Sequence, residues 1–160
     1  MAAGARAGNG VWIDEMCRTS LPDIYAIGDC ALHANAFACG NLIRLESVQN
    51  ANDMAVVATM HILGTAQPYL AVPRFWSDQY NLRLQTVGLP IYHDDTIVRG
   101  DPASGAFSVI YLREGAVVAL DCVNAARDFM QGRHLVAGSH KLSRDVLQDV
   151  SRPLKAAANS

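Results

Sequence analysis

The chain has 160 residues, of which 51% are hydrophobic and 18% charged, and its formal net charge is -2. This composition is too apolar for a disordered chain, and the length predicts one domain or two small ones at roughly 100–200 residues per domain. A net charge near zero gives no electrostatic basis for binding nucleic acid. No apolar run reaches the ~18 residues needed to cross a membrane, so we expect no membrane-embedded segment.

The four cysteines, at positions 17, 30, 39 and 122, show neither a C-x-x-C pair nor the spacing of a disulfide framework. This pattern favours free, buried thiols in a reducing compartment, and therefore a cytoplasmic protein. Residues 1–8 lack the apolar segment of a secretory signal and the Arg and Ser content of a transit peptide. We expect them to form a flexible leader, with ordered structure beginning near Val11.

The first half of the chain predicts two short strands, over residues 11–13 and 24–27, and irregular structure over residues 30–43. Its clearest element is a helix over residues 47–63, which opens with a good N-cap, Ser47, and stops before a glycine. Apolar side chains lie on several sides of this helix, so we expect it to be mostly buried.

The second half changes character after Pro73. Strand-like segments, separated by turns rich in Gly, Pro and Asp, follow at residues 75–80, 82–87, 96–99, 107–112 and 117–123. The last two are closely spaced and predict an antiparallel hairpin. Helical patterns return at residues 124–132 and 143–150, so this half predicts a small α+β module.

The sequence lacks the motifs of several enzyme classes. The five histidines have neither H-E-x-x-H nor a Cys/His ligand spacing, so no metal site is predicted. The sequence also contains no G-x-S-x-G, P-loop or G-x-G-x-x-G motif. His61, within an apolar helix, is more typical of a core residue with its hydrogen bonds satisfied than of a catalyst.

One segment carries a chemical signal: residues 19–29, Thr-Ser-Leu-Pro-Asp-Ile-Tyr-Ala-Ile-Gly-Asp. It predicts a buried strand that delivers an acidic side chain to its carboxyl end, where open α/β sheets bind ligands. Gly28 permits a close backbone approach, and Asp29 can accept hydrogen bonds from sugar-like hydroxyls. Turns also use the Gly-Asp dipeptide, so these residues alone leave a plain turn open.

The same segment resembles the second FAD fingerprint of flavin-dependent pyridine-nucleotide reductases. Further segments are similar to the ferredoxin, rubredoxin and putidaredoxin reductases that serve oxygenases. They are residues 44–51 (Arg-Leu-Glu-Ser-Val-Gln-Asn-Ala), 72–80 (Val-Pro-Arg-Phe-Trp-Ser-Asp-Gln-Tyr), 98–102, 107–112, 121–124 and 152–155. The resemblance extends over nearly everything from Val11 onward and is to the C-terminal portion of that family.

The resemblance implies a role for each matching residue. Gly28 and Asp29 would contact the ribityl chain of FAD. The helix start at Ser47, Val48 and Gln49 would direct backbone N–H groups toward the pyrimidine edge of the flavin, where reduction places negative charge. Taken without the family, Ser47 is simply an N-cap.

Trp76 would lie near the flavin or on the surface that meets an electron-transfer partner, and a core aromatic is its alternative interpretation. The family's partners are small acidic ferredoxins (2Fe–2S) or rubredoxins, so Arg44 and Arg74 would steer docking unless they are ordinary surface arginines. Cys30 is predicted to be a buried, inert thiol, because the chain lacks the close cysteine pair of the thiol-relay flavoenzymes.

The family carries two nucleotide-binding modules before this region, with the first FAD glycine fingerprint and the NAD(P)H glycine motif, and this sequence contains neither. The implied fold is α+β. Residues 1–66 would be the C-terminal remnant of a Rossmann-like α/β FAD-binding domain, and residues 67–160 a small reductase C-terminal domain with an antiparallel sheet. The chain would therefore hold half of an FAD site, no metal site and no catalytic residue.

The resemblance implies the C-terminal part of a flavoprotein that passes electrons from NAD(P)H through FAD to an iron–sulfur protein, with little or no turnover by this chain alone. Two alternatives stay open. One is a non-enzymatic interaction module that dimerises with a second copy. The other is one chain of a split reductase, whose missing FAD and NAD modules lie on another polypeptide. The sequence does not distinguish NADH from NADPH.

Overall fold

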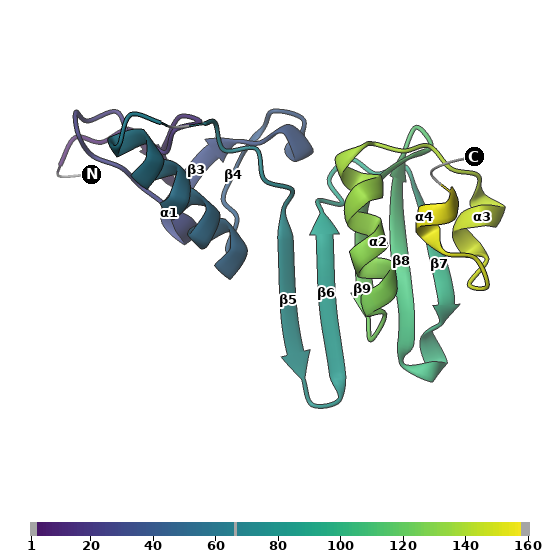
Figure 1. The fold of residues 1–160 in the computed structure, drawn as a ribbon. Coiled ribbons are helices and arrows are strands. Elements are labelled where there is room, and N and C mark those ends of the chain that lie inside the picture. Colours follow the sequence, from purple (N-terminus) through teal and green to yellow (C-terminus); the bar gives the residue numbers. More distant parts are fainter. Residues whose placement is uncertain (1–2, 66, 158–160) are drawn as a thin grey trace. The chain divides into compact units, whose positions relative to one another are not determined.

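The computed structural model describes residues 3–65 and 67–157, which fold into two compact units, Met1–Pro73 and Arg74–Ser160. Each unit contains its own sheet and helices (Figure 1). Met1 and Ala2 of the expected leader, and Ala66 at the expected domain boundary, lie outside the described residues. Along the described chain, no helix has the length and apolar character needed to cross a membrane.

The first unit contains a small mixed sheet. Its strands, in the order β1-β2-β3-β4, are β1 (Ala7–Gly8), β2 (Gly10–Trp12), β3 (Ala31–Ala34) and β4 (Leu42–Ile43). The central strands β2 and β3 are parallel, with Val11 opposite Ala31, whereas both outer pairs are antiparallel. Parallel pairing between segments so far apart in sequence is typical of α/β domains, and it agrees with the expected remnant of one.

Helix α1 (Val48–Ile62) is the main helix of the first unit and lies where the sequence predicts it. The Ser47 side chain accepts a hydrogen bond from the Asn50 backbone N–H at 3.1 Å, which is an N-cap. Gly64, with a φ of 76°, follows the last turn and stops the helix.

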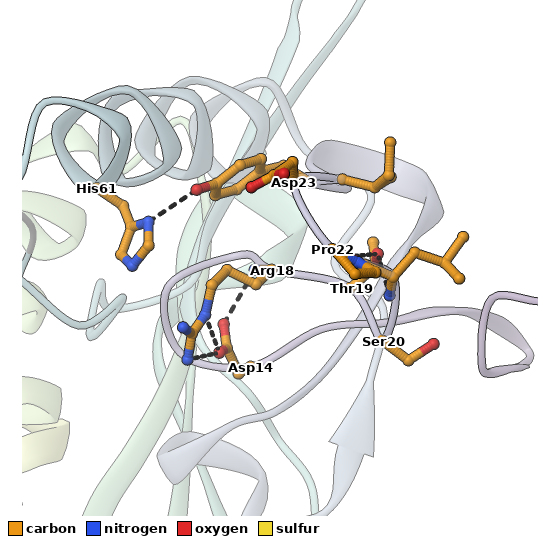
Figure 2. Close-up of a pocket in the computed structure, with 10 residues that line it drawn as sticks. Asp14, Arg18, Thr19, Ser20, Pro22, Asp23 and His61 are labelled. Carbon is orange, nitrogen blue, oxygen red and sulfur yellow. Dashed lines mark hydrogen bonds and ion pairs between the residues drawn. The ribbon is translucent and has the colours of Figure 1, made fainter.

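The buried strand expected at residues 24–27 is not present. The φ angles of Asp23 (59°) and Gly28 (69°) interrupt the extended backbone on both sides, and only Tyr25 makes a bridge, to Arg18. The hydroxyl of Tyr25 instead bonds His61 Nδ1 on α1 at 2.8 Å (Figure 2). Strand β3 and the short helices η1 (Gly28–Cys30) and η2 (Ala36–Ala38) follow, in the region expected to be mostly irregular.

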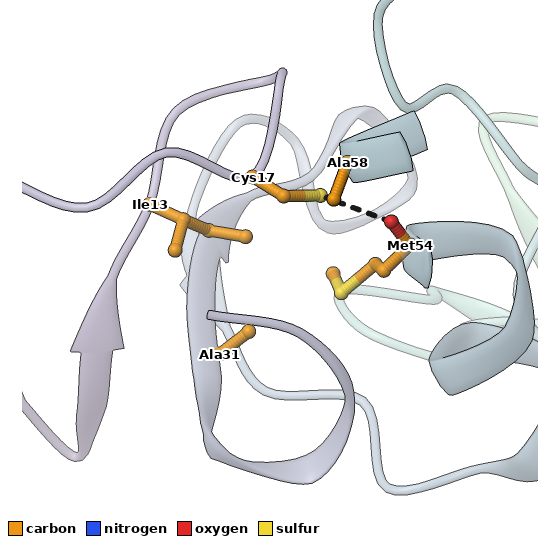
Figure 3. Packing of buried hydrophobic residues seen from close by; sticks show 5 residues of the cluster. All are labelled: Ile13, Cys17, Ala31, Met54 and Ala58. Atoms are coloured by element: carbon orange, nitrogen blue, oxygen red, sulfur yellow. Dashed lines mark hydrogen bonds between the residues drawn. The ribbon is translucent and has the colours of Figure 1, made fainter. Parts of the chain in front are cut away.

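Helix α1 packs one face against the sheet and the loops of the first unit. The core cluster is shown in Figure 3 and consists of Ile13, Cys17, Ala31, Met54 and Ala58. The prediction of a mostly buried helix is wrong, because the apolar side chains on its other sides have no neighbours to pack against within the unit. Val56 and Ile62 are 61% and 67% exposed.

Two further expectations from the first half are wrong. The leader is partly ordered, since β1 pairs with β2 and the Arg6 guanidinium lies over the Trp12 ring, 3.6 Å from its centroid. Among the cysteines, Cys17 and Cys122 are buried, but Cys30 and Cys39 are exposed because they lie in or next to short surface helices.

The second unit contains an antiparallel sheet of order β5-β6-β9-β8-β7. Its strands lie at the predicted segments and are β5 (Arg74–Gln79), β6 (Leu82–Gly88), β7 (Asp95–Asp101), β8 (Ala106–Arg113) and β9 (Ala116–Val123). The predicted hairpin of the last two strands is confirmed. Strand β5 forms one edge of the sheet.

Three helices complete this unit, α2 (Ala126–Ala137), α3 (Arg144–Gln148) and α4 (Leu154–Ala157), and the short helix η3 (Pro102–Ser104) links β7 to β8. Helix α2 packs on β9 and β6, while α3 packs against β7 (Figure 1). The predicted α+β architecture with an antiparallel sheet is therefore confirmed.

The buried guanidinium of Arg99 fastens the C-terminal segment to this sheet. Its side chain is 4% exposed, and its Nε pairs with the Asp128 carboxylate of α2 at 3.0 Å. The other two nitrogens donate at 2.7–3.1 Å to the backbone carbonyls of Leu147, Asp149 and Arg152. One side chain on β7 thus holds α2 and the segment from α3 to α4 in place.

Replacing Arg99 by Met should lower the free energy of unfolding by about 3–5 kcal/mol, because it leaves the partly buried Asp128 carboxylate without its cation and three carbonyls without a donor. Urea unfolding followed by circular dichroism measures this change. The control is Arg83→Met, which removes an exposed ion pair to Asp78 and should change stability by about 0.5 kcal/mol or less. Equal effects of the two variants would contradict the role given to Arg99.

The imidazole of His33, on β3, should make the stability of the first unit depend on pH. Burial lowers the pKa of His33 below its ordinary value of 6.5, so the folded state favours the neutral ring. As the pH falls through 6.5, His33 takes up a proton in the unfolded chain before it does so in the folded chain. The free energy of unfolding therefore decreases in acid. Urea unfolding at about pH 7.5 and about pH 5.5 should show this loss, and His33→Phe should reduce it.

Candidate functional site

The Gly-Asp pair and the start of α1 come together through one close backbone contact. Gly28 is buried, and a Cβ atom built on it would lie 3.2 Å from the Cβ of Ala51 on the first turns of α1. The absence of a side chain, together with a φ of 69°, lets η1 lie directly against the helix. The sequence motif therefore serves first to bring two separate segments into contact.

Asp29 is placed differently from the sequence expectation. It lies in η1, before β3, rather than at the carboxyl end of a strand, because no strand forms at residues 24–27. Its side chain is exposed, and among the described residues its carboxylate has no hydrogen-bond partner. Asp29 therefore presents a free acceptor beside the start of α1.

The first turn of α1 offers hydrogen-bond donors next to this acceptor. The Ser47 hydroxyl accepts a hydrogen bond from the N–H of Asn50, while the N–H of Val48 has no acceptor among the described residues. Gln49 is 7% exposed, and its side-chain amide donates to the Asp53 carboxylate one turn later. Its side-chain nitrogen is thus engaged within the helix, and the donor that this turn leaves open is the backbone N–H of Val48.

Arg44 fixes the position of Asp29. One terminal nitrogen donates to the backbone carbonyl of Asp29 at 2.9 Å, and the other pairs with the Glu46 carboxylate at 2.8 Å. Its Nε is buried and has no hydrogen-bond partner within residues 3–65 and 67–157. The side chain is 29% exposed and lies mostly along the surface of the first unit. Its hydrogen bond restrains the backbone of Asp29.

Trp76 and Arg74 belong to the second unit, on the edge strand β5. Their positions alternate with that of Phe75, so both side chains lie on the same face of the sheet. Trp76 is 43% exposed and is therefore not a core aromatic. Its ring is open to contact from outside the second unit.

A polar cavity of about 490 Å³ in the first unit was not predicted from the sequence (Figure 2). Two of its charged groups pair with each other, since Arg18 Nε donates to the Asp14 carboxylate at 2.7 Å. Burial acts to raise the pKa of Asp14, but hydrogen bonds from Arg18 and Met16 hold it below its usual value. His61, which also lines the cavity, is half-buried and bonded to Tyr25, whereas the exposed Asp23 carboxylate has no partner among the described residues.

Sequence reasoning also missed a buried hydrogen-bond network at the start of α1. Asn50 is fully buried, and its side-chain oxygen accepts a hydrogen bond from the Tyr69 hydroxyl at 2.8 Å. The two residues are 19 positions apart, and no local pattern connects them. Only the tertiary structure shows that they meet.

Two family models match the chain. The model described as "Reductase C-terminal" matches residues 74–158, and the "Pyridine nucleotide-disulphide oxidoreductase" model matches residues 2–55. The chain is 62% identical, over 155 residues, to the 5,5'-dehydrodivanillate O-demethylase ferredoxin reductase subunit of Sphingobium sp. (strain NBRC 103272 / SYK-6). That match covers 97% of this chain and 38% of the relative, so the chain spans less than half of the relative's length.

Solved structures agree with these matches. The ferredoxin reductase for the CYP199A2 system from Rhodopseudomonas palustris superposes with a TM-score of 0.90 at 38% identity, over 98% of this chain and 39% of that one. The covalent putidaredoxin reductase–putidaredoxin complex gives a TM-score of 0.91 at 39% identity, over 99% of this chain and 39% of that chain. Both span the two units described above.

Replacing Gly28 by Ala should lower the free energy of unfolding by about 1–2 kcal/mol, because the new Cβ is strained at positive φ and crowds Ala51. Gly40→Ala is a matched control, since Gly40 has a φ of 78° and open space around its Cα. It reports the cost of the backbone strain alone. A Gly28→Ala loss no larger than the Gly40→Ala loss, in urea unfolding, would show that the contact with Ala51 is not tight.

Proposed function

Because the chain belongs to the family of FAD-dependent ferredoxin reductases, whose C-terminal portion it matches, we propose that it forms one part of the flavin site of such an enzyme. FAD, when bound, would take a hydride from NAD(P)H and pass electrons singly to an iron–sulfur protein. The observation that carries the proposal is the contact between η1 and α1, which places a free carboxylate beside free helix N–H groups.

The described residues fit a flavin nucleotide in chemical terms. The unpartnered Asp29 carboxylate is suited to accept hydrogen bonds from the hydroxyls of a ribityl chain. The N–H of Val48 and the positive end of the α1 dipole are suited to a hydrogen-bond acceptor that gains negative charge, as the pyrimidine edge of a flavin does on reduction. Gly28 and Ser47 hold these two groups in place.

The second unit offers contacts of its own for a cofactor or a partner. The exposed ring of Trp76 is suited to pack on a flat aromatic group or to meet a protein partner. Arg74, on the same face of β5, would add positive charge for a small acidic iron–sulfur protein. Arg44 of the first unit would act mainly on the flavin, because it is bound to the backbone of Asp29.

The chain by itself should be inactive. It spans about two fifths of the relatives' length, and α1 exposes apolar side chains such as Val56, Met60 and Ile62. An uncovered apolar helix face of this kind is typical of a surface that another part of the protein covers. We propose that the remaining modules of the reductase, in the same or another polypeptide, cover it and complete the binding of FAD and NAD(P)H.

The test is a chimera in which the part of the Sphingobium reductase that this chain does not match is joined to the N-terminal end of this chain. The chimera should bind FAD stoichiometrically and catalyse NADH-dependent reduction of a ferredoxin, whereas the 160-residue chain alone should do neither. Flavin absorbance and a dye-reduction assay measure both properties. Stoichiometric FAD and full turnover by the chain alone would contradict the proposal.

Within the chimera, Asp29→Ala should weaken FAD binding about tenfold or more, because hydrogen bonds to a charged group contribute about 1.5–3 kcal/mol each. Asp145→Ala is the control, since Asp145 is an exposed carboxylate on α3, which packs against β7 at the edge of the second sheet opposite β5. Isothermal titration of the FAD-free proteins measures the two affinities. Equal affinities would remove Asp29 from the site.

A further inference from the structure

The start of α1 is held by an amide that has no contact with solvent. Asn50 is 0% exposed, and its backbone N–H donates to Ser47 Oγ at 3.1 Å. Its side-chain nitrogen donates to the backbone carbonyl of Leu45 at 2.8 Å. The amide therefore ties the segment that precedes the helix to the first turn of the helix. The path of residues 45–50, which includes the N–H of Val48, therefore depends on the orientation of this one side chain.

Tyr69 sets that orientation. Its hydroxyl donates to Asn50 Oδ1 at 2.8 Å. The tyrosine is itself anchored, because its backbone N–H donates to the Glu15 carbonyl at 2.9 Å and its ring meets His33 edge-on at a centroid distance of 5.4 Å. A rigidly held donor thus faces the only side-chain acceptor of a buried amide, and removing it leaves that acceptor unsatisfied.

We propose that Tyr69 is a positioning residue for the flavin site, acting through Asn50 on the first turn of α1. The proposal rests on the proposed function, since it assigns the N–H groups of this turn to the flavin. Loss of the hydroxyl lets the Asn50 amide turn and the first turn loosen. The helix N-terminus then stabilises negative charge on the flavin less well.

The same helix provides a matched control at its other end. Tyr25 donates to, or accepts from, His61 Nδ1 at 2.8 Å, with a similar side chain and a similar partly buried setting. Tyr69→Phe removes the hydroxyl that bonds Asn50 at the start of α1. Tyr25→Phe removes the hydroxyl that bonds His61 at the other end, more than two turns away from Val48. Any general loss of helix stability should appear in both variants, whereas a change confined to the first turn should appear only in Tyr69→Phe.

The first measurement uses the 160-residue chain without cofactor. Amide hydrogen exchange at Asn50 and Ala51, whose N–H groups donate to Ser47, should become at least about tenfold faster in Tyr69→Phe and change little in Tyr25→Phe. Exchange rates that are unchanged in Tyr69→Phe would overturn the proposal irrespective of flavin binding.

The second measurement is the midpoint potential of FAD in the chimera. Tyr69→Phe should weaken the binding of reduced relative to oxidised flavin about tenfold, which lowers the potential of a two-electron couple by about 30 mV, and Tyr25→Phe should leave the potential unchanged. Equal potentials in all three proteins would overturn the proposal. A chimera that binds no FAD would refute the proposed function. In that case the hydrogen-exchange measurement alone would show whether Tyr69 holds the start of α1 in place.

Discussion

The contact between Gly28 and Ala51 is the constraint on which the candidate site depends. Two segments that are separated by β3, η2 and β4 lie against each other because one residue has no side chain and the other has only a methyl group. A hydrogen-bond acceptor and the donor end of a helix thereby become neighbours. A larger residue at either position would separate them by the thickness of a side chain, while both segments could otherwise keep their local conformations.

Each unit contains a buried polar side chain that joins distant segments. In the first unit it is Asn50, which connects the segment before α1 to Tyr69; in the second it is Arg99, which connects β7 to α2 and the C-terminal segment. Each side-chain nitrogen and oxygen of these two residues makes at least one hydrogen bond, and such groups specify one packing arrangement because the alternatives leave a donor or acceptor unpaired. The two networks lie within separate units, so neither requires the other.

Local signals explain why the second unit was predicted well. Its strands β7, β8 and β9 largely alternate in burial, and glycine turns with positive φ, such as Gly105 and Gly115, separate them. In the first unit the strands have only two to four residues, and their pairing joins distant segments. Residues 24–27 have the composition of a strand, but the positive φ of Asp23 overrides it. At the site, Ser47 carries a local capping signal, whereas the partners of Arg44 and Asn50 exist only in the tertiary structure.

The exposure of Cys30 has a practical consequence. Its thiol is adjacent in sequence to Asp29 and lies on the surface, whereas Cys17 and Cys122 are buried and burial raises the pKa of each to about 11. Thiolate-selective reagents should therefore leave those two untouched at neutral pH. With the exposed Cys39 replaced by Ser, a single fluorophore or spin label can be attached beside the carboxylate. The chain thus carries a natural attachment point from which ligand occupancy can be followed directly, without waiting for turnover.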